Sequence, residues 1–137
     1  MKFFCDTSFF IAYYNASDQY HTRAVNRLKS VISSIPTLVT TDYVFDETLT
    51  FLLKTHAING YKRAHRYDLD INIEHKVSLI FTTEIIFTRA REIFFRYNKD
   101  KKWSFTDCVS FALMKDLGIK EVLSFDNNFK EMGFRII

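Results

Sequence analysis

The chain has 137 residues, which favours a single domain over residues 1–137. Apolar residues make up 47% of it and the formal net charge is only +3, which excludes intrinsic disorder and a strongly basic nucleic-acid-binding arm. No apolar run approaches the ~20 residues that a membrane-spanning helix needs, and two cysteines do not make a disulfide framework, so we expect a cytoplasmic protein with no membrane contact.

Apolar residues at helical spacing predict helices, and short apolar or β-branched runs predict strands. In chain order, the predicted elements are a strand over 2–5, helices over 9–14 and 20–32, a strand over 37–40, helices over 43–54 and 58–69, a strand over 76–82, helices over 84–97 and 106–117, and strands over 122–125 and 134–137. Gly118 is expected to cap the helix that precedes it. This alternation predicts an α/β fold, a three-layer sandwich in which helices cover both faces of a central, mostly parallel sheet of four or five strands.

Two acidic residues follow directly after predicted strands. Asp6 comes after the first strand and Asp126 after the fourth. Parallel strands end at the same edge of a sheet, and ligands of open α/β sheets bind beyond that edge. The two carboxylates are therefore expected to lie near each other, although 120 positions separate them in the sequence.

Two further acidic positions lie on predicted helices. Asp107 lies in the first turn of an apolar helix, where a carboxylate is costly to bury unless it is paired or bound to a metal ion. Asp46 and Glu47 border opposite edges of the apolar stripe of the helix over 43–54, and periodicity alone does not choose between them. Converging carboxylates repel one another unless protons or cations lie between them, and oxygen ligands suit Mg²⁺ or Mn²⁺. The pattern predicts metal-assisted hydrolysis of a phosphodiester.

Each of these acidic residues also has a simpler interpretation. Asp6 and Asp126 could cap a helix or form a turn, Asp107 could favour a helix N-terminus, and the residue on the helix over 43–54 could be a solvated flank. The joint pattern is more specific than any one of its members.

Four short motifs, in order along the whole chain, resemble those of the PIN-domain nucleases, and most closely the VapC-type toxins of prokaryotic toxin–antitoxin pairs. The motifs are FFCDTS over 3–8, TDYVFDETL over 41–49, SFTDCVSFA over 104–112 and VLSFDNNF over 122–129. The resemblance implies a PIN-like fold and a catalytic, Mg²⁺- or Mn²⁺-binding cluster made of Asp6, Glu47, Asp107 and Asp126.

The same resemblance implies an endoribonuclease that leaves 5′-phosphate and 3′-hydroxyl ends on RNA. It also implies a cognate antitoxin protein and a homodimer. Hydroxyl residues beside the acids are candidates for orienting the carboxylates: Thr7, Ser8, Ser104 and Thr106. Ser104 and Asp107 also fit a variant of the helix capping box, and both roles are compatible.

A basic segment with aromatic residues precedes the third motif. Its basic side chains could contact RNA phosphates, and Trp103 or Tyr97 could stack on a base. The candidates are Arg96, Lys99, Lys101, Lys102 and Trp103. The alternative interpretation is a solvated loop.

Other functions fit the residues less well. A haloacid-dehalogenase-type phosphotransferase needs a second Asp two residues after Asp6, where this chain has Ser8. A response-regulator receiver needs paired acids after the first strand and a Lys after a late strand, and neither is in place. An RNA-processing PIN nuclease without a toxin role and a catalytically inactive PIN-like binding module both remain alternatives.

Overall fold

Five parallel strands form the centre of the computed structural model, which describes residues 1–137. The strands are β1 (Lys2–Cys5), β2 (Thr37–Thr41), β3 (Ser78–Ile80), β4 (Glu121–Leu123) and β5 (Arg135–Ile136). Their order across the sheet is β3-β2-β1-β4-β5, and every neighbouring pair is parallel. The predicted α/β class and parallel sheet are confirmed, with β1 at the centre.

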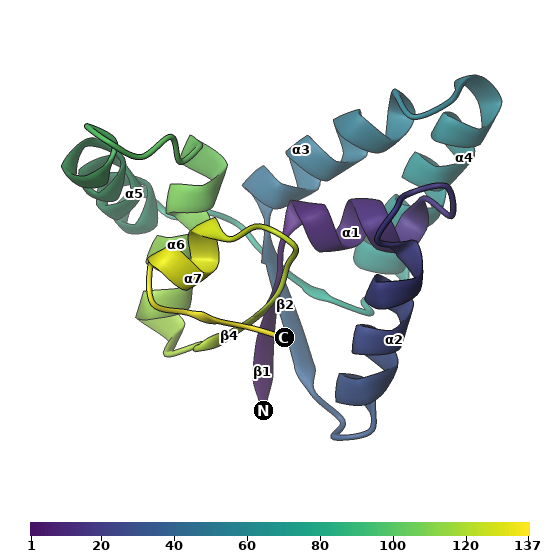
Figure 1. Ribbon diagram of the computed structural model, residues 1–137, viewed down its shortest axis with the longest axis horizontal. Helices are drawn as coiled ribbons and strands as arrows, with labels where there is room; N and C mark the ends of the chain where they lie inside the picture. The colour runs from purple at the N-terminus through teal and green to yellow at the C-terminus, as the bar shows by residue number, and fades with distance from the viewer.

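Helices cover both faces of this sheet (Figure 1), as a three-layer sandwich requires. They are α1 (Thr7–Tyr14), α2 (His21–Ile32), α3 (Asp42–Leu53), α4 (Ala57–Asp68), α5 (Glu84–Tyr97), α6 (Phe105–Leu117) and α7 (Asn128–Glu131). Figure 1 shows α1, α2 and α4 on one side of the sheet and α5, α6 and α7 on the other. The helix α3 rises from the end of β2 and packs against α4.

Hydroxyl residues at the N-cap positions explain where two of the helices that carry site residues begin. Thr41 accepts a hydrogen bond from the backbone N–H of Val44 at 3.1 Å and begins α3. Ser104 accepts from the N–H of Asp107 at 3.0 Å and begins α6, whose other end is capped by Gly118 at a φ of +67°. The predicted glycine cap is therefore confirmed.

Three local features differ from the sequence prediction. The helix predicted over 58–69 continues into a π-helical turn, η1 (Leu69–Ile73). Helix α7 has a single turn and was not predicted, because four residues are too few for a periodic pattern. Strand β3 has three residues rather than the seven predicted, because only Ser78–Ile80 pair with β2.

The apolar core lies on both faces of β1. Phe4 is fully buried and lies opposite Val39 of β2 and Val122 of β4. The same core continues into α6, where Phe111 and Met114 are fully buried. None of the helices is long and apolar enough to cross a membrane.

Candidate active site

The carboxyl ends of the strands carry the predicted acidic residues. Because β1, β2 and β4 run in the same direction, their ends meet at one edge of the sheet, at the top of Figure 1. Asp6 follows β1 directly, and its backbone N–H donates to the carbonyl of Leu123 at the end of β4 at 3.1 Å. The topology thus brings the first and last motifs of the chain together, as the sequence predicted.

Asp6 is held by two serines rather than used as a helix cap. It occupies the N-cap position of α1, yet its side chain makes no capping hydrogen bond. Instead, its Oδ2 accepts hydrogen bonds from the hydroxyls of Ser8 and Ser124, both at 3.0 Å. The carboxylate is 3% exposed, so this orientation is fixed inside the protein.

Asp107 combines the two roles that its sequence allowed. Ser104 and Asp107 form a reciprocal capping box at the start of α6, in which Asp107 Oδ2 accepts from the Ser104 N–H at 3.3 Å. The same oxygen accepts from Nδ2 of Asn128 at 3.1 Å. Asp107 is buried, so its carboxylate both caps α6 and meets the segment that follows β4 inside the protein.

Asn128 connects Asp107 to Asp126. Its side-chain Nδ2 donates to Asp126 Oδ2 at 3.3 Å, while its backbone N–H donates to Asp126 Oδ1 at 3.0 Å. The turn interpretation of Asp126 is therefore also correct, since this aspartate organises the turn before α7. Asp126 is only partly buried, so it lies between the interior and solvent.

Glu47 and Asp46 on α3 differ in their electrostatic effect on Asp107 and not in exposure. Both side chains are exposed, and both line a shallow hollow of about 300 Å³ together with Thr106. The negative charge of Glu47, however, contributes to raising the pKa of Asp107, which places Glu47 near that carboxylate. Of the two acids between which periodicity did not choose, Glu47 is therefore the one whose charge acts on Asp107.

Burial and mutual repulsion raise the pKa of two of these carboxyl groups. Burial raises the pKa of Asp6 to about 7, and the charge of Asp107 adds to the effect. Burial also raises the pKa of Asp107 to about 6, with a contribution from Asp126 and a partial offset by the hydrogen bond from Asn128. No Lys or Arg forms an ion pair with Asp6, Glu47, Asp107 or Asp126. The protein therefore does not compensate these charges with its own cations.

This donor set suits a hard divalent cation in its chemistry. All four side chains offer carboxylate oxygens, the ligands that Mg²⁺ and Mn²⁺ prefer. No group of three or more His, Cys, Asp or Glu side chains is gathered closely enough in the structure to hold an ion. The residues fit a metal ion by type and by uncompensated charge.

The predicted hydroxyl residues have different surroundings. Ser8 bonds to Asp6, and Ser104 bonds to Asp107 within the capping box. The hydroxyl of Thr7 is buried without a hydrogen-bond partner, and Thr106 contributes its carbonyl oxygen to Ser110. Neither threonine hydroxyl bonds to a carboxylate of the cluster.

Sequence reasoning missed Ser124 and Asn128 as members of this site. Both lie in the fourth motif, on either side of Asp126. A polar residue that ends a buried strand, and an amide two residues after an acid, are the signals that could have identified them.

The prediction that Trp103 stacks on a base is wrong. Its side chain is 3% exposed, and its ring packs against Phe111 with centroids 5.1 Å apart. The indole N–H donates to Glu131 at 3.3 Å, and the backbone N–H donates to Asn98 at 2.9 Å. Trp103 therefore anchors the loop before α6 in the core and offers no face to a ligand.

The basic side chains around Trp103 remain at the surface. Arg96, Lys99 and Lys102 are exposed, while Lys101 is half-buried and lies 3.5 Å from Glu131 in an ion pair. Three of the four predicted phosphate contacts are thus free to meet a polyanion.

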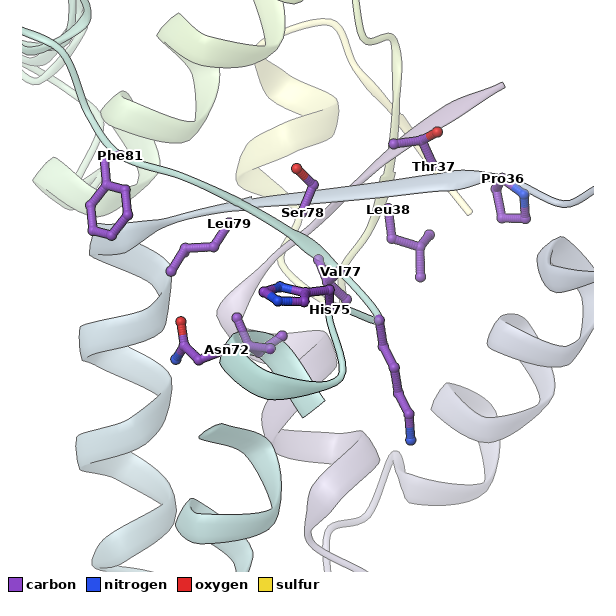
Figure 2. Close-up of a pocket in the computed structure, with 11 residues that line it drawn as sticks. Pro36, Thr37, Leu38, Asn72, His75, Val77, Ser78, Leu79 and Phe81 are labelled. Atoms are coloured by element: carbon purple, nitrogen blue, oxygen red, sulfur yellow. The ribbon is translucent and has the colours of Figure 1, made fainter. Parts of the chain in front are cut away.

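A separate hollow of about 540 Å³ lies along the open edge of β3. Figure 2 shows Leu38, His75, Ser78 and Leu79 around it. None of the residues that line it is acidic, and none belongs to the cluster at the carboxyl edge. This hollow is therefore separate from the acidic residues at the carboxyl edge of the sheet.

Comparison with known proteins places the chain in a family. The profile of the PIN domain family matches residues 3–135. The chain is 33% identical over 133 residues to a Mycobacterium tuberculosis protein named 23S rRNA-specific endonuclease VapC20, covering 96% of this chain and 94% of the relative. It is 29% identical over 126 residues to a VapC ribonuclease of Archaeoglobus fulgidus, covering 90% of this chain and 76% of the relative.

Solved structures agree with the sequence relatives. The crystal structure of Mycobacterium tuberculosis VapC20, described as a Sarcin-Ricin loop cleaving toxin, matches with a TM-score of 0.83 and 31% identity over 96% of this chain and 95% of that one. VapBC2 of Rickettsia felis, bound to a DNA fragment from its promoter, matches with a TM-score of 0.71 at 11% identity over 100% of this chain and 98% of that one, which shows a common fold. The chain therefore belongs to the PIN domain family, among its VapC-type members.

Proposed function

We propose that this chain is an endoribonuclease that requires Mg²⁺ or Mn²⁺ and acts as the toxin of a toxin–antitoxin pair. The observation that carries the proposal is that Asp6, Asp107 and Asp126, on segments that meet at the carboxyl edge of the sheet, and Glu47 on α3 have no cationic partner. The kinship with proteins named VapC ribonucleases supports RNA as the substrate. Hydrolysis would leave a 5′-phosphate and a 3′-hydroxyl.

Asp6, Glu47, Asp107 and Asp126 would hold the metal ion and are the proposed catalytic residues. When bound, a divalent ion supplies Lewis acidity toward a phosphodiester group and toward water. The hydroxyls of Ser8 and Ser124 orient Asp6, and the amide of Asn128 orients Asp107 and Asp126. These donors fix the carboxylate directions before any substrate arrives.

The RNA backbone would meet the exposed basic residues that precede α6. Arg96, Lys99 and Lys102 carry positive charge beside the helix that presents Asp107. Such contacts with phosphates strengthen binding without reading sequence. The buried Trp103 holds the end of this segment in place.

A protein antitoxin and a second copy of this chain are the proposed partners, and the cytoplasm is the proposed location. The basis is the kinship with VapC20, whose crystal structure is described as that of a toxin, and the resemblance to toxins of toxin–antitoxin pairs. An antitoxin would keep the nuclease inactive until it is removed.

The nuclease activity is tested with a labelled hairpin from 23S rRNA, chosen because one relative is named for that substrate. We expect cleavage with Mg²⁺ or Mn²⁺, none in excess chelator, and none with the variant Asp126→Asn. Undiminished cleavage in chelator would contradict the metal requirement. Full activity of Asp126→Asn would remove that residue from the site.

The toxin role needs a separate test in cells. Expression of the wild type should arrest growth, and co-expression of the neighbouring gene product should relieve the arrest, while Asp126→Asn should be harmless. If the wild type is harmless in a matched host but cleaves RNA in vitro, the chain is a processing nuclease instead.

A further inference from the structure

The loop that presents Asp126 is held from outside the acidic cluster by helix α2. Nη1 of Arg27 donates a hydrogen bond to the carbonyl of Ser124 at 3.1 Å. The guanidinium carbon of the same arginine lies over the ring of Phe125, 4.4 Å from its centroid. These contacts join residues almost 100 positions apart and are made by a helix that contributes no acidic residue to the site.

Arg27 belongs to a stack of aromatic and cationic side chains. The ring of Tyr20 lies parallel to that of Phe125, with centroids 4.8 Å apart and planes inclined by 8°. The ring of Tyr20 and the guanidinium of Arg27 thus both pack against Phe125. These contacts join α2 and the residue before it to the segment that carries Asp126.

The segment that Arg27 holds controls the direction of two carboxylates. The hydroxyl of Ser124 donates to Asp6 at 3.0 Å and accepts from the N–H of Asp126 at 2.9 Å. The N–H of Phe125 donates to the hydroxyl of Ser8 at 2.9 Å, and that hydroxyl donates to Asp6. A shift of the segment would therefore move Asp126 and misdirect Asp6 at once.

Arg27 has no carboxylate partner that would explain its place. It takes part in none of the ion pairs of the protein. Its side chain is half-buried, and its observed polar contact is the Ser124 carbonyl. A planar group that can donate to a carbonyl and lie flat on a ring at the same time is a property of arginine that lysine lacks.

We propose that Arg27 is a positioning residue for the acidic site, which holds the segment 124–126 so that Asp6 and Asp126 face the metal ion together. This rests on the proposed metal-dependent function. An arginine near a nuclease site could instead bind an RNA phosphate. The positioning role differs because Arg27 then acts on the orientation of the carboxylates and makes no contact with the RNA.

The test compares Arg27→Met and Arg27→Lys with the matched control Arg23→Met. Methionine keeps an unbranched stem on α2, and lysine keeps the charge. Arg23 lies on the same helix, 5.7 Å from the centroid of the Tyr20 ring, and donates no hydrogen bond to the loop. Three quantities are measured: Mn²⁺ affinity by calorimetry without RNA, kcat and KM for RNA cleavage, and hydrogen exchange of the Phe125 and Asp126 amides.

We expect both Arg27 variants to bind Mn²⁺ about tenfold more weakly and to lose a similar factor in kcat, with KM near the wild-type value. Removing a positive charge near a cation site would by Coulomb's law alone strengthen ion binding, so weaker binding in Arg27→Met identifies a positioning effect. The two amides should exchange about fivefold faster, because one hydrogen bond no longer holds the loop. Arg23→Met should match the wild type in all three.

Two results would overturn the proposal. One is unchanged or stronger Mn²⁺ binding in Arg27→Met with only KM raised, which would make Arg27 a phosphate contact. The other is unchanged amide exchange in both Arg27 variants. If the wild type cleaves no RNA but the Arg27 variants still lose Mn²⁺ affinity and amide protection, the proposed function fails while the positioning role stands.

Discussion

Asp6 and Asp70 are both buried carboxylates, 3% and 5% exposed, yet their surroundings have opposite character. Asp70 accepts hydrogen bonds from the Tyr14 hydroxyl at 2.7 Å and from Nη2 of Arg66 at 2.8 Å, and Nζ of Lys76 lies 3.1 Å away. Burial acts to raise the pKa of Asp70, but these donors and charges outweigh it and the pKa is lowered. The charge of Asp70 is compensated within the chain.

Asp6 receives hydrogen bonds from neutral donors alone, the hydroxyls of Ser8 and Ser124 and the backbone of Thr7, and the charge that acts on it is that of another carboxylate, Asp107. Its pKa is raised to about 7 by burial and by that repulsion. Asp70 therefore has cationic partners within the chain, whereas Asp6, which is equally buried, has none. Buried carboxylates without cationic compensation are common at functional sites, whereas Asp70 lies in an ion-pair network of the structural kind.

The largest expected effect is that of Asp6→Asn. RNA cleavage should fall by more than about 100-fold, the upper limit usual for residues that only orient metal ligands. The free energy of unfolding in chelator at pH 7.5 should rise by about 1 to 3 kcal/mol, because an amide carries no charge to bury. Initial rates and urea unfolding measure the two effects.

The pH dependence of this gain follows from the raised pKa. A carboxyl group with a pKa of about 7 in the folded state and about 4 unfolded contributes stability below pH 4 that is lost as the pH rises through 7. The advantage of Asp6→Asn over the wild type should therefore be greater at pH 7.5 than at pH 5. A destabilised variant at pH 7.5 would mean that Asp6 is compensated as Asp70 is.

The second-largest expected effect is a rise in the free energy of unfolding of the wild type when a divalent ion binds. At a Mn²⁺ concentration 100 times its dissociation constant, the free energy of unfolding should rise by about 2.7 kcal/mol. Asp107→Asn should lose most of this gain, because it removes a carboxylate of the cluster. Asp70→Asn should retain the gain, because its network already has its own cations. Equal stabilisation of all three proteins would place ion binding elsewhere.

The sequence predicted the fold because its signals are local and mutually consistent. Every predicted strand and helix appears in the structure, and Asp6 and Asp126 meet at one edge because parallel topology requires it. Boundaries were less accurate where pairing decides them, as in β3, or where a turn is too short for periodicity, as in α7.

The contacts of the site were less predictable than its acids. Whether Ser124 and Asn128 bond to carboxylates depends on side-chain directions across chain-distant segments. The burial of Trp103 likewise depends on its packing against Phe111 of α6. The basic residues next to it in the sequence suggested an exposed position instead. The cationic compensation of Asp70 joins α1, α4 and the chain before β3, and no sequence motif signals it.

A smaller effect distinguishes Glu47 from Asp46. Glu47→Gln should lower RNA cleavage about tenfold, the lower limit usual for groups that tune a metal site, because Glu47 is the member of the pair whose charge reaches Asp107. Asp46→Asn, the matched control on the same helix, should stay within about twofold of the wild type, as most surface substitutions do. Cleavage rates at saturating Mn²⁺ measure both. The reverse order would place Asp46 in the cluster instead.

The smallest expected effect is that of Asp70→Asn, which tests the compensated half of the comparison. The free energy of unfolding at pH 7.5 should fall by about 1 kcal/mol, a modest loss because the partners Arg66 and Lys76 are themselves half exposed and return to water. The pKa of Asp70 is lowered, so its stabilisation exists above the unfolded pKa and disappears as the pH falls through the folded one. The deficit of Asp70→Asn should therefore shrink toward pH 3, opposite in direction to the Asp6→Asn gain, while RNA cleavage per folded molecule stays at the wild-type rate. If fully folded Asp70→Asn cleaves RNA more slowly than the wild type, Asp70 contributes to the active site, and its role is not purely structural as proposed.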